Sequence, residues 1–227
     1  MTQIKATYVD HMGSDLSVVN AARVSFGKHH TAVTPGDTKL IKYLAKHKHL
    51  SPFGHAFASF HVKAPLFVAR QLVKHSYLRW NEVSRRYVDN DPEFYSPTKW
   101  RGRSADKKQG SAGSLDLSLF DHNGEVRGAV NDGLRADWLL EENNEACLRL
   151  YQVKLKAGVC PEQARMVLPQ NTMTEWFWSG SLDAFSSMCK LRCATDTQVE
   201  TQNVAWDINW EMEELFPVSW AALMEDY

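Results

Sequence analysis

The chain has 227 residues, a formal net charge of −1 and 44% hydrophobic residues. This length suits one substantial hydrophobic core or at most two small ones, and the near-neutral charge excludes a generally basic surface for duplex nucleic acid. Because no apolar run is long enough to span a bilayer and the N-terminus lacks the apolar core of a signal peptide, we expect a cytoplasmic protein without membrane partners. No shift in composition divides the sequence, so residues 1–227 are predicted to form a single domain.

Short strands and helices alternate through the first part of the chain. Apolar spacing predicts strands over residues 4–9 and 56–63 and helices over residues 15–23 and about 37–46. Ser14 or Asp15 is expected to cap the first of these helices and Asp37 the second. A third helix is predicted from about Pro65, because a proline at the first helical position loses only an N–H group that has no partner there. Its apolar positions continue to Tyr77 and define one buried face.

Four histidines follow the second predicted helix, between positions 47 and 61. Imidazole is a common ligand for zinc or iron, which makes a metal site one interpretation of this group. The spacing matches no known site, however, and Pro52 breaks the segment between them, so we predict no metal. The histidines are His47, His49, His55 and His61.

A window of basic residues follows between positions 70 and 87, with Glu82 as its single acid. A solvated helix face is the first interpretation, but such faces usually mix both signs at a spacing of four, which this window scarcely does. A nucleic-acid patch is the second, and the net charge of the chain argues against it. We favour a site for a phosphate group and a planar ring, in which a looped segment over residues 81–87 adds backbone N–H groups. The basic side chains are Arg70, Lys74, Arg79, Arg85 and Arg86.

Residues 97–115 are rich in small and basic side chains and nearly devoid of apolar ones. This composition predicts a loop, and the whole region from 97 to 126 is expected to be an insertion. It is either disordered or a mobile flap that offers Trp100, Arg101 and Lys107 to a cofactor tail or an incoming ring. The sequence supports both interpretations equally.

Helices dominate the remainder of the chain. Apolar spacing predicts helix across most of residues 117–156, a short helix over 161–169, and a helix or helix pair over 181–204. A buried strand is predicted at residues 175–178, and the acidic, aromatic tail through Trp220 is expected to close the core.

Two arginines and four cysteines in this part of the chain stand out. Arg165 and Arg192 lie in apolar sequence, where a buried guanidinium requires a partner. A structural acid such as Glu162 or Glu200 and an anionic substrate explain them equally well. The cysteines lack a CxxC spacing and are expected to be reduced thiols, with the last two in the core rather than in a zinc pair. They are Cys147, Cys160, Cys189 and Cys193.

The window from 70 to 87 resembles the signature of the flavin-dependent thymidylate synthases, in which an Arg-Gln pair precedes an Arg-His-Arg triplet and spaced Ser, Asn, Glu, Ser and Arg residues. Residues 22–26 and 46–55 resemble further segments of the same family. Three positions depart from the signature, because Lys74 and Ser76 replace arginines and Arg79 replaces a serine. The matching positions are Arg70, Gln71, His75, Asn81, Glu82, Ser84, Arg86 and Tyr87.

This resemblance implies an α+β fold of several helices around a small, mostly antiparallel sheet. It implies reductive methylation of dUMP to dTMP with FAD as the cofactor, 5,10-methylenetetrahydrofolate as the carbon donor and NADPH as the reductant. It also implies a homotetramer with active sites built between subunits. Two alternatives remain, which are a pyrimidine nucleotide hydroxymethylase of the same fold and a non-catalytic homologue that binds nucleotides or RNA.

The resemblance further assigns roles to individual residues. Arg192 and Ser84 would act in catalysis, the first by stabilising charge that develops on the uracil edge and the second as a hydroxyl donor. Arg79 would restore the guanidinium lost at Ser76, because we expect both residues on one helix, one turn apart. The substrate-binding residues would be Gln71, Lys74, Glu82, Ser84, Arg85, Arg86, Arg165 and Arg192. The cofactor-binding residues would be His49, Ser51, Lys74, His75, Ser76, Arg79, Glu82, Ser181, Asp183 and Ser187.

Overall fold

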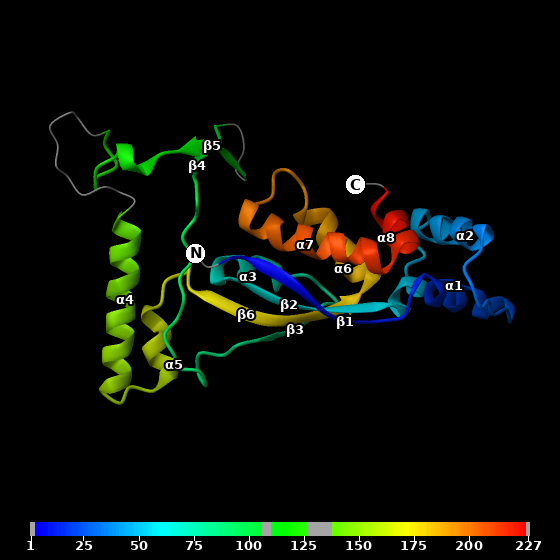
Figure 1. Cartoon of the computed structure of the whole chain (residues 1–227), viewed down its shortest axis with the longest axis horizontal. Helices are drawn as coiled ribbons and strands as arrows, with labels where there is room; N and C mark the ends of the chain where they lie inside the picture. Colours follow the sequence, from blue (N-terminus) through cyan, green and yellow to red (C-terminus); the bar gives the residue numbers. More distant parts are fainter. Residues whose placement is uncertain (1–2, 106–109, 127–137, 226–227) are drawn as a thin grey trace. The chain divides into compact units, whose positions relative to one another are not determined.

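A computed structural model of the chain describes residues 3–105, 110–126 and 138–225 (Figure 1). The chain divides into two compact units, each of which is described by itself. We call them the sheet unit, which holds residues 4–64, 68–82 and 175–227, and the hairpin unit, which holds residues 1–3, 65–67 and 83–174. The α+β class predicted from the sequence is confirmed.

A four-stranded sheet forms the centre of the sheet unit (Figure 1). Its order is β1 (Lys5–Met12), β2 (Phe57–Pro65), β6 (Met173–Ser181) and β3 (Arg79–Glu82). The β1–β2 and β6–β3 pairs are antiparallel. Buried residues alternate with more exposed ones along β2 and β6, as expected for strands with one face on the core. The three strands predicted from the sequence are therefore confirmed, and each extends beyond its predicted range.

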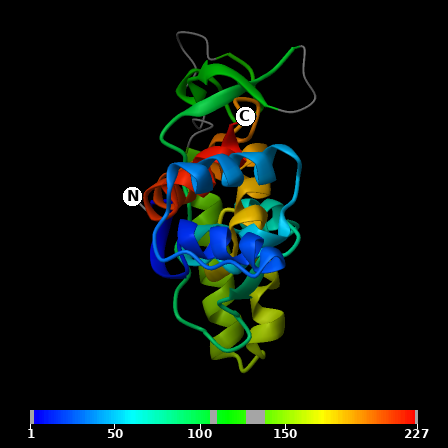
Figure 2. The same cartoon turned by 90° about the vertical axis from the view of Figure 1, so that its right-hand side faces the viewer.

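Helices cover the sheet and complete the core of this unit. In Figure 1, α6 (Leu182–Arg192), α7 (Val199–Leu215) and α8 (Pro217–Met224) lie on one side of the strands. Figure 2 shows α2 (Pro35–Lys46) beside α8, which also contacts α1 (Asp15–Arg23). The short helices η1 (Val24–Phe26) and η2 (Ser51–His55) follow α1 and α2. The aromatic tail closes the core as predicted, because Trp220 is only 2% exposed.

The cap of α2 differs from the prediction. Thr34 is the N-cap, and Asp37, the third residue of the helix, forms a capping box with it. The Asp37 carboxylate is fully buried and accepts hydrogen bonds from Arg23, His30 and Thr34. Burial by itself raises the pKa of Asp37, but the hydrogen bonds from Thr34, His30 and Arg23 outweigh it and hold that pKa well below its usual range. This carboxylate therefore joins the end of α1, the following loop and α2.

Asp37→Asn should lower the free energy of unfolding at pH 7 by about 3 kcal/mol, since it removes one partner of a buried ion pair. Urea denaturation measures this difference, with the exposed Asp10→Asn as a control that should stay near wild type. A carboxyl whose pKa is lowered by folding stabilises above its unfolded pKa of about 3.9 and loses that contribution as the pH falls further. The difference should therefore shrink below about pH 4. Equal stability of wild type and Asp37→Asn at pH 7 would contradict this assignment.

The third predicted helix is shorter than expected. It is α3 (Leu66–Leu72), and the chain leaves the helical conformation at Val73. Tyr77 has a left-handed φ of 64° and is 85% exposed, so it cannot continue the apolar face of a helix. Arg79 opens β3 instead. The expectation that Ser76 and Arg79 share a helix is therefore wrong.

The hairpin unit corrects two further predictions. Residues 97–115 are not simply a loop, because β4 (Trp100–Arg103) and β5 (Ser111–Leu115) pair antiparallel, and η3 (Leu117–Leu119) follows them. The long helix is α4 (Trp138–Lys156), which begins well after residue 117. Lys107 and the predicted helical positions 130 and 134 lie outside the described residues. The predicted short helix is present as α5 (Pro161–Ala164) followed by η4 (Arg165–Val167).

Burial along α4 is less extensive than its apolar spacing predicts. Of its residues, Asn144 and Tyr151 are buried, whereas Leu148 and Leu155 are only partly covered. The described residues include no helix with both the length and the apolar character of a membrane span. All four cysteines are free thiols, and Cys189 and Cys193 are buried as predicted.

Candidate active site

Three segments assigned to the flavin meet at the N-terminus of α6 in the sheet unit. The backbone N–H of Leu182 donates to the carbonyl oxygen of Ala56 at 3.1 Å, which joins the helix to the end of η2. The turn at Tyr77 and Leu78 passes over Gly180, where a Cβ would collide with the Leu78 side chain. All the predicted flavin residues belong to the sheet unit. Those on the three segments are His49, Ser51, Lys74, His75, Ser76, Ser181, Asp183 and Ser187.

Backbone strain is concentrated in two of these segments. Among the described residues, Lys48 and Tyr77 are the non-glycine residues with positive φ, at 56° and 64°. Each such residue costs on the order of 1–3 kcal/mol and persists where the surroundings enforce it, often at ligand-binding turns. Lys48 precedes His49, and Tyr77 follows Ser76. The strained positions therefore lie next to residues that the sequence assigned to the cofactor.

The first turn of α6 carries a carboxylate. The hydroxyl of Ser181 donates to Asp183 Oδ1 at 2.5 Å, and the hydroxyl of Ser187 donates to the backbone oxygen of Asp183 at 2.9 Å. A negative side chain in the first turn offsets the positive end of the helix dipole. This helix end is therefore better suited to hydroxyl or amino groups than to a phosphate.

Arg192, at the end of α6, is held by two acceptors. Its Nε donates to His75 Nε2 at 3.0 Å, and one terminal nitrogen donates to the backbone oxygen of Gln71 at 3.4 Å. Burial, with the charge of Arg192 beside it, lowers the pKa of His75 to about 4. The neutral imidazole accepts at Nε2 and so carries its proton on Nδ1. Both acceptors are uncharged, which leaves the positive charge of the guanidinium available to an anionic or carbonyl-bearing ligand.

Glu82 ends β3 on a rigid aromatic support. Trp80 Nε1 donates to Glu82 Oε2 at 3.1 Å. The ring of Trp80 stacks on that of Trp176, with 4.2 Å between centroids. This stack fixes the carboxylate at the strand end, where the sequence predicts contact with both nucleotide and flavin.

The remaining substrate candidates belong to the hairpin unit. Ser84 Oγ accepts hydrogen bonds from the backbone N–H and the Nε of Arg86, at 3.3 and 3.2 Å, so its own hydroxyl proton can be donated to a ligand. Arg85 donates to the backbone and side-chain oxygens of Asn90. Arg165 was expected to be buried but is exposed. Its Nε donates to the backbone oxygen of Glu162 at 3.4 Å.

Known proteins resemble this chain over nearly its whole length. A family model described as thymidylate synthase complementing protein matches residues 7–218. A flavin-dependent thymidylate synthase of Thermus thermophilus is 38% identical over 217 residues, which cover 96% of this chain and 74% of the relative. One from Kosmotoga olearia is 37% identical over 217 residues, covering 95% and 88%. The chain belongs to the flavin-dependent thymidylate synthase family.

Solved structures agree with this assignment. The UMP/dUMP methylase PolB of Streptomyces cacaoi, bound with 5-Br UMP, is 28% identical and matches with a TM-score of 0.80 over 99% of this chain and 95% of its own. A second PolB structure, bound with 5-Br dUMP, matches with a TM-score of 0.73 over 99% and 96%. The resemblance found in the basic window therefore extends to the fold of the whole chain.

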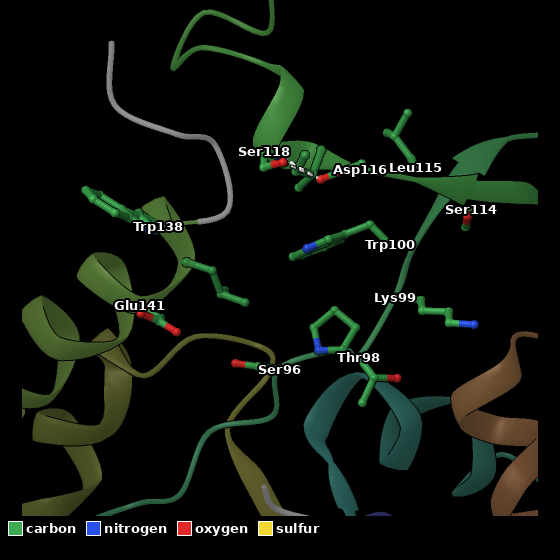
Figure 3. Close-up of a pocket in the computed structure, with 13 residues that line it drawn as sticks. Ser96, Thr98, Lys99, Trp100, Ser114, Leu115, Asp116, Ser118, Trp138 and Glu141 are labelled. Carbon is green, nitrogen blue, oxygen red and sulfur yellow. Dashed lines mark hydrogen bonds between the residues drawn. The ribbon is translucent and has the colours of Figure 1, made fainter. Parts of the chain in front are cut away.

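The hairpin of this flavin-dependent thymidylate synthase borders a hollow. Its volume is about 590 Å³, and it lies between the hairpin and the start of α4. Figure 3 shows the indole of Trp100 reaching into it from β4, with Glu141 and Ser96 nearby and Lys99 turned aside. Arg101 instead donates to Ser111 Oγ at 3.0 Å across the hairpin. Of the predicted flap residues that the structure describes, Trp100 is thus placed to meet a planar ring.

Three of the four histidines considered for a metal make other contacts. His47 and His49 pack against Tyr43, with ring centroids 4.3 and 6.1 Å away. His61 Nε2 lies 3.1 Å from a carboxylate oxygen of Glu175. Within the described parts of the chain, no group of three or more possible metal ligands comes together.

The lowered pKa of His75 should make stability depend on pH. In the unfolded chain this histidine binds a proton near pH 6.5, whereas in the folded chain it stays neutral until about pH 4. The free energy of unfolding should therefore fall as the pH is lowered from about 6.5 to 4. His75→Gln should flatten this slope in urea titrations, and exposed His55→Gln should retain it. An unchanged slope in His75→Gln would show that folding does not exclude the proton.

Proposed function

We propose that this flavin-dependent thymidylate synthase converts dUMP to dTMP, with 5,10-methylenetetrahydrofolate as the carbon donor and NADPH as the reductant. The convergence of Ala56, the Tyr77 turn and Gly180 at the start of α6 is the observation that best supports a flavin site in this chain. When bound there and reduced by NADPH, the flavin would supply the hydride that turns the transferred carbon into a methyl group.

The side chains of the sheet unit would bind and activate the pyrimidine. Arg192, fixed by His75 and Gln71, can direct its remaining N–H donors at the uracil carbonyl edge. A fixed positive charge at that edge stabilises the negative charge that develops when C5 attacks the incoming carbon. Glu82 and Lys74 would complete the polar surround, with Glu82 reaching both nucleotide and cofactor.

The phosphate and sugar would be held by one serine and three arginines, which are Ser84, Arg85, Arg86 and Arg165. Ser84 can donate its hydroxyl proton, and Arg86 brings a guanidinium to the same turn. Arg85 and Arg165 would add charge from their own positions. Active sites built between the subunits of a homotetramer are part of the same proposal, and the native mass in solution tests that assembly.

FAD would be held mainly by the strained turns and the N-terminus of α6. His49, Ser51, His75 and Ser76 would supply hydrogen-bonding groups, and Asp183 would bind ribose hydroxyls or the adenine amino group rather than the pyrophosphate. The cationic partner for the pyrophosphate would be Arg79, which stands at the start of β3 directly after the Tyr77 turn.

Arg79→Ala should weaken FAD binding by about tenfold or more, because an ionic hydrogen bond to a phosphate contributes roughly 1.5–3 kcal/mol. Flavin fluorescence during titration of the apoprotein measures the dissociation constant. Arg103→Ala, on the exposed end of β4, is the matched control and should leave it unchanged. Wild-type affinity in Arg79→Ala would remove Arg79 from the cofactor site.

The mass of the nucleotide product tests the proposed reaction. Incubation of the purified protein with dUMP, methylenetetrahydrofolate and NADPH should yield dTMP. A product carrying a hydroxymethyl group would instead identify a hydroxymethylase. A colourless preparation without dUMP-dependent NADPH oxidation would identify a non-catalytic homologue.

A further inference from the structure

The beginning of α7 reaches the candidate nucleotide residues of the sheet unit. The hydroxyl of Thr201 donates to Gln71 Oε1 at 3.2 Å, and Gln71 Nε2 donates to Gln198 Oε1. The backbone oxygen of Gln71 accepts from Arg192. One hydrogen-bonded network therefore links the start of α7 through Gln71 to the guanidinium at the end of α6.

The network uses each end of the Gln71 amide once. An amide has two N–H donors and an oxygen with two lone pairs, so one donor and one lone pair remain for a ligand. Without the hydroxyl of Thr201 and the oxygen of Gln198, the amide could rotate about its terminal torsion, which has a broad and nearly two-fold profile. The contacts on α7 thus determine which polar atoms Gln71 presents.

We propose that Thr201 and Gln198 are positioning residues for the nucleotide. They act through Gln71, whose side chain they orient and whose backbone oxygen holds Arg192. This inference rests on the proposed function of the site. It adds to that function two residues at the start of α7, which hold the recognition groups of α3 and α6 in place.

A packing role for Thr201 is the competing explanation, because its side chain is 0% exposed. Two substitutions separate the two roles. Thr201→Val keeps the shape and removes the hydroxyl, whereas Thr201→Ser keeps the hydroxyl and removes the methyl group. A positioning role makes valine the more harmful change for dUMP binding, and a packing role makes serine the more harmful one.

Calorimetric titration of the FAD-loaded protein with dUMP provides the measurement. Thr201→Val should raise the dissociation constant about fivefold to tenfold, the effect of losing one buried hydrogen bond. Thr201→Ser should stay within about twofold of wild type, although its smaller side chain lowers the thermal midpoint. In steady-state assays that vary dUMP, Thr201→Val should change kcat less than KM. A larger loss of dUMP affinity in serine than in valine would overturn the proposal.

Two substitutions at Gln198 provide an independent test in case a variant of the buried Thr201 fails to fold. Gln198→Met removes the acceptor at similar length, and Gln198→Glu retains an oxygen acceptor. The methionine variant should bind dUMP about fivefold more weakly, and the glutamate variant should restore binding. Wild-type affinity in Gln198→Met would exclude the positioning role of this residue. Absence of dUMP binding by the wild type would overturn the proposed function itself, whereas wild-type binding with no effect of the variants would overturn this inference alone.

Discussion

Replacing Arg192 with lysine should lower dUMP-dependent NADPH oxidation about a hundredfold or more, even at saturating dUMP. The guanidinium donates through Nε to His75 and through a terminal nitrogen to Gln71. Its remaining N–H groups can donate to the uracil edge. Lysine offers a single nitrogen without a planar set of donors, so it cannot keep both supports and also stabilise charge on the uracil edge. Steady-state assays that vary dUMP separate the loss in kcat from any change in KM.

Arg149→Lys is the matched control for this substitution. Arg149 lies on α4, where it pairs with Glu145 at 3.3 Å on an exposed surface. Exposed pairs of this kind contribute little to stability, so activity should remain at the wild-type level. Loss of flavin or of folding in Arg192→Lys would appear in the visible and circular dichroism spectra. A folded, flavin-loaded Arg192→Lys enzyme with wild-type kcat would refute the catalytic role of this arginine.

Arg86→Ala should lower kcat/KM for dUMP by about tenfold to a hundredfold and leave the much slower reaction with deoxyuridine unchanged. Its guanidinium is held by Ser84 Oγ and lies 5.1 Å from the centre of the Tyr87 ring, which orients it in the turn. A charge-assisted hydrogen bond to phosphate is available only when the substrate carries that group. The ratio of the two substrates therefore isolates phosphate binding from effects on folding.

Arg85→Ala supplies the comparison for this second prediction. Because Arg85 donates to two oxygens of Asn90, more of its role is to fix the loop that follows the turn. In Arg85→Ala we therefore expect kcat/KM to fall by more similar factors with dUMP and with deoxyuridine. An equal loss with both substrates in Arg86→Ala would show that Arg86 does not bind the phosphate.

Local sequence patterns were sufficient for most of the helices and strands. Ser14, one of the two predicted caps, is the N-cap of α1. The alternation of apolar residues at 56–63 and the aromatic run at 175–178 correctly predicted β2 and β6. These elements follow from side-chain periodicity and from capping chemistry, which depend on neighbours in the sequence. Their register in the sheet was not predictable in the same way.

Elements that depend on distant contacts were missed. Apolar spacing predicted that α3 continues to Tyr77. The turn at Tyr77 instead packs over Gly180 of β6, and this packing fixes a left-handed φ that tyrosine disfavours. The hairpin of β4 and β5 was expected to be a loop because its residues have little apolar content. Cross-strand hydrogen bonds, which composition does not reveal, form it instead.

In the site, too, residues with a local sequence signal were predicted and residues that depend on distant contacts were not. Residues in the basic window and Arg192 were identifiable by their chemistry and by the family signature. Thr201 and Gln198 were assigned no role, because their partner Gln71 lies 130 and 127 positions away in sequence. The histidine at position 75 was expected to bind the cofactor, and its contact with Arg192 gives it a structural task that sequence alone did not suggest.

A crystal structure of the protein soaked with FAD and dUMP tests the central claim most directly. It should show the isoalloxazine ring against the turn at Tyr77 and the start of α6, with the uracil edge within hydrogen-bonding distance of Arg192. If both ligands bound elsewhere, or if the Arg192 side chain pointed into bulk solvent with the pocket empty, the assignment of this site would be wrong.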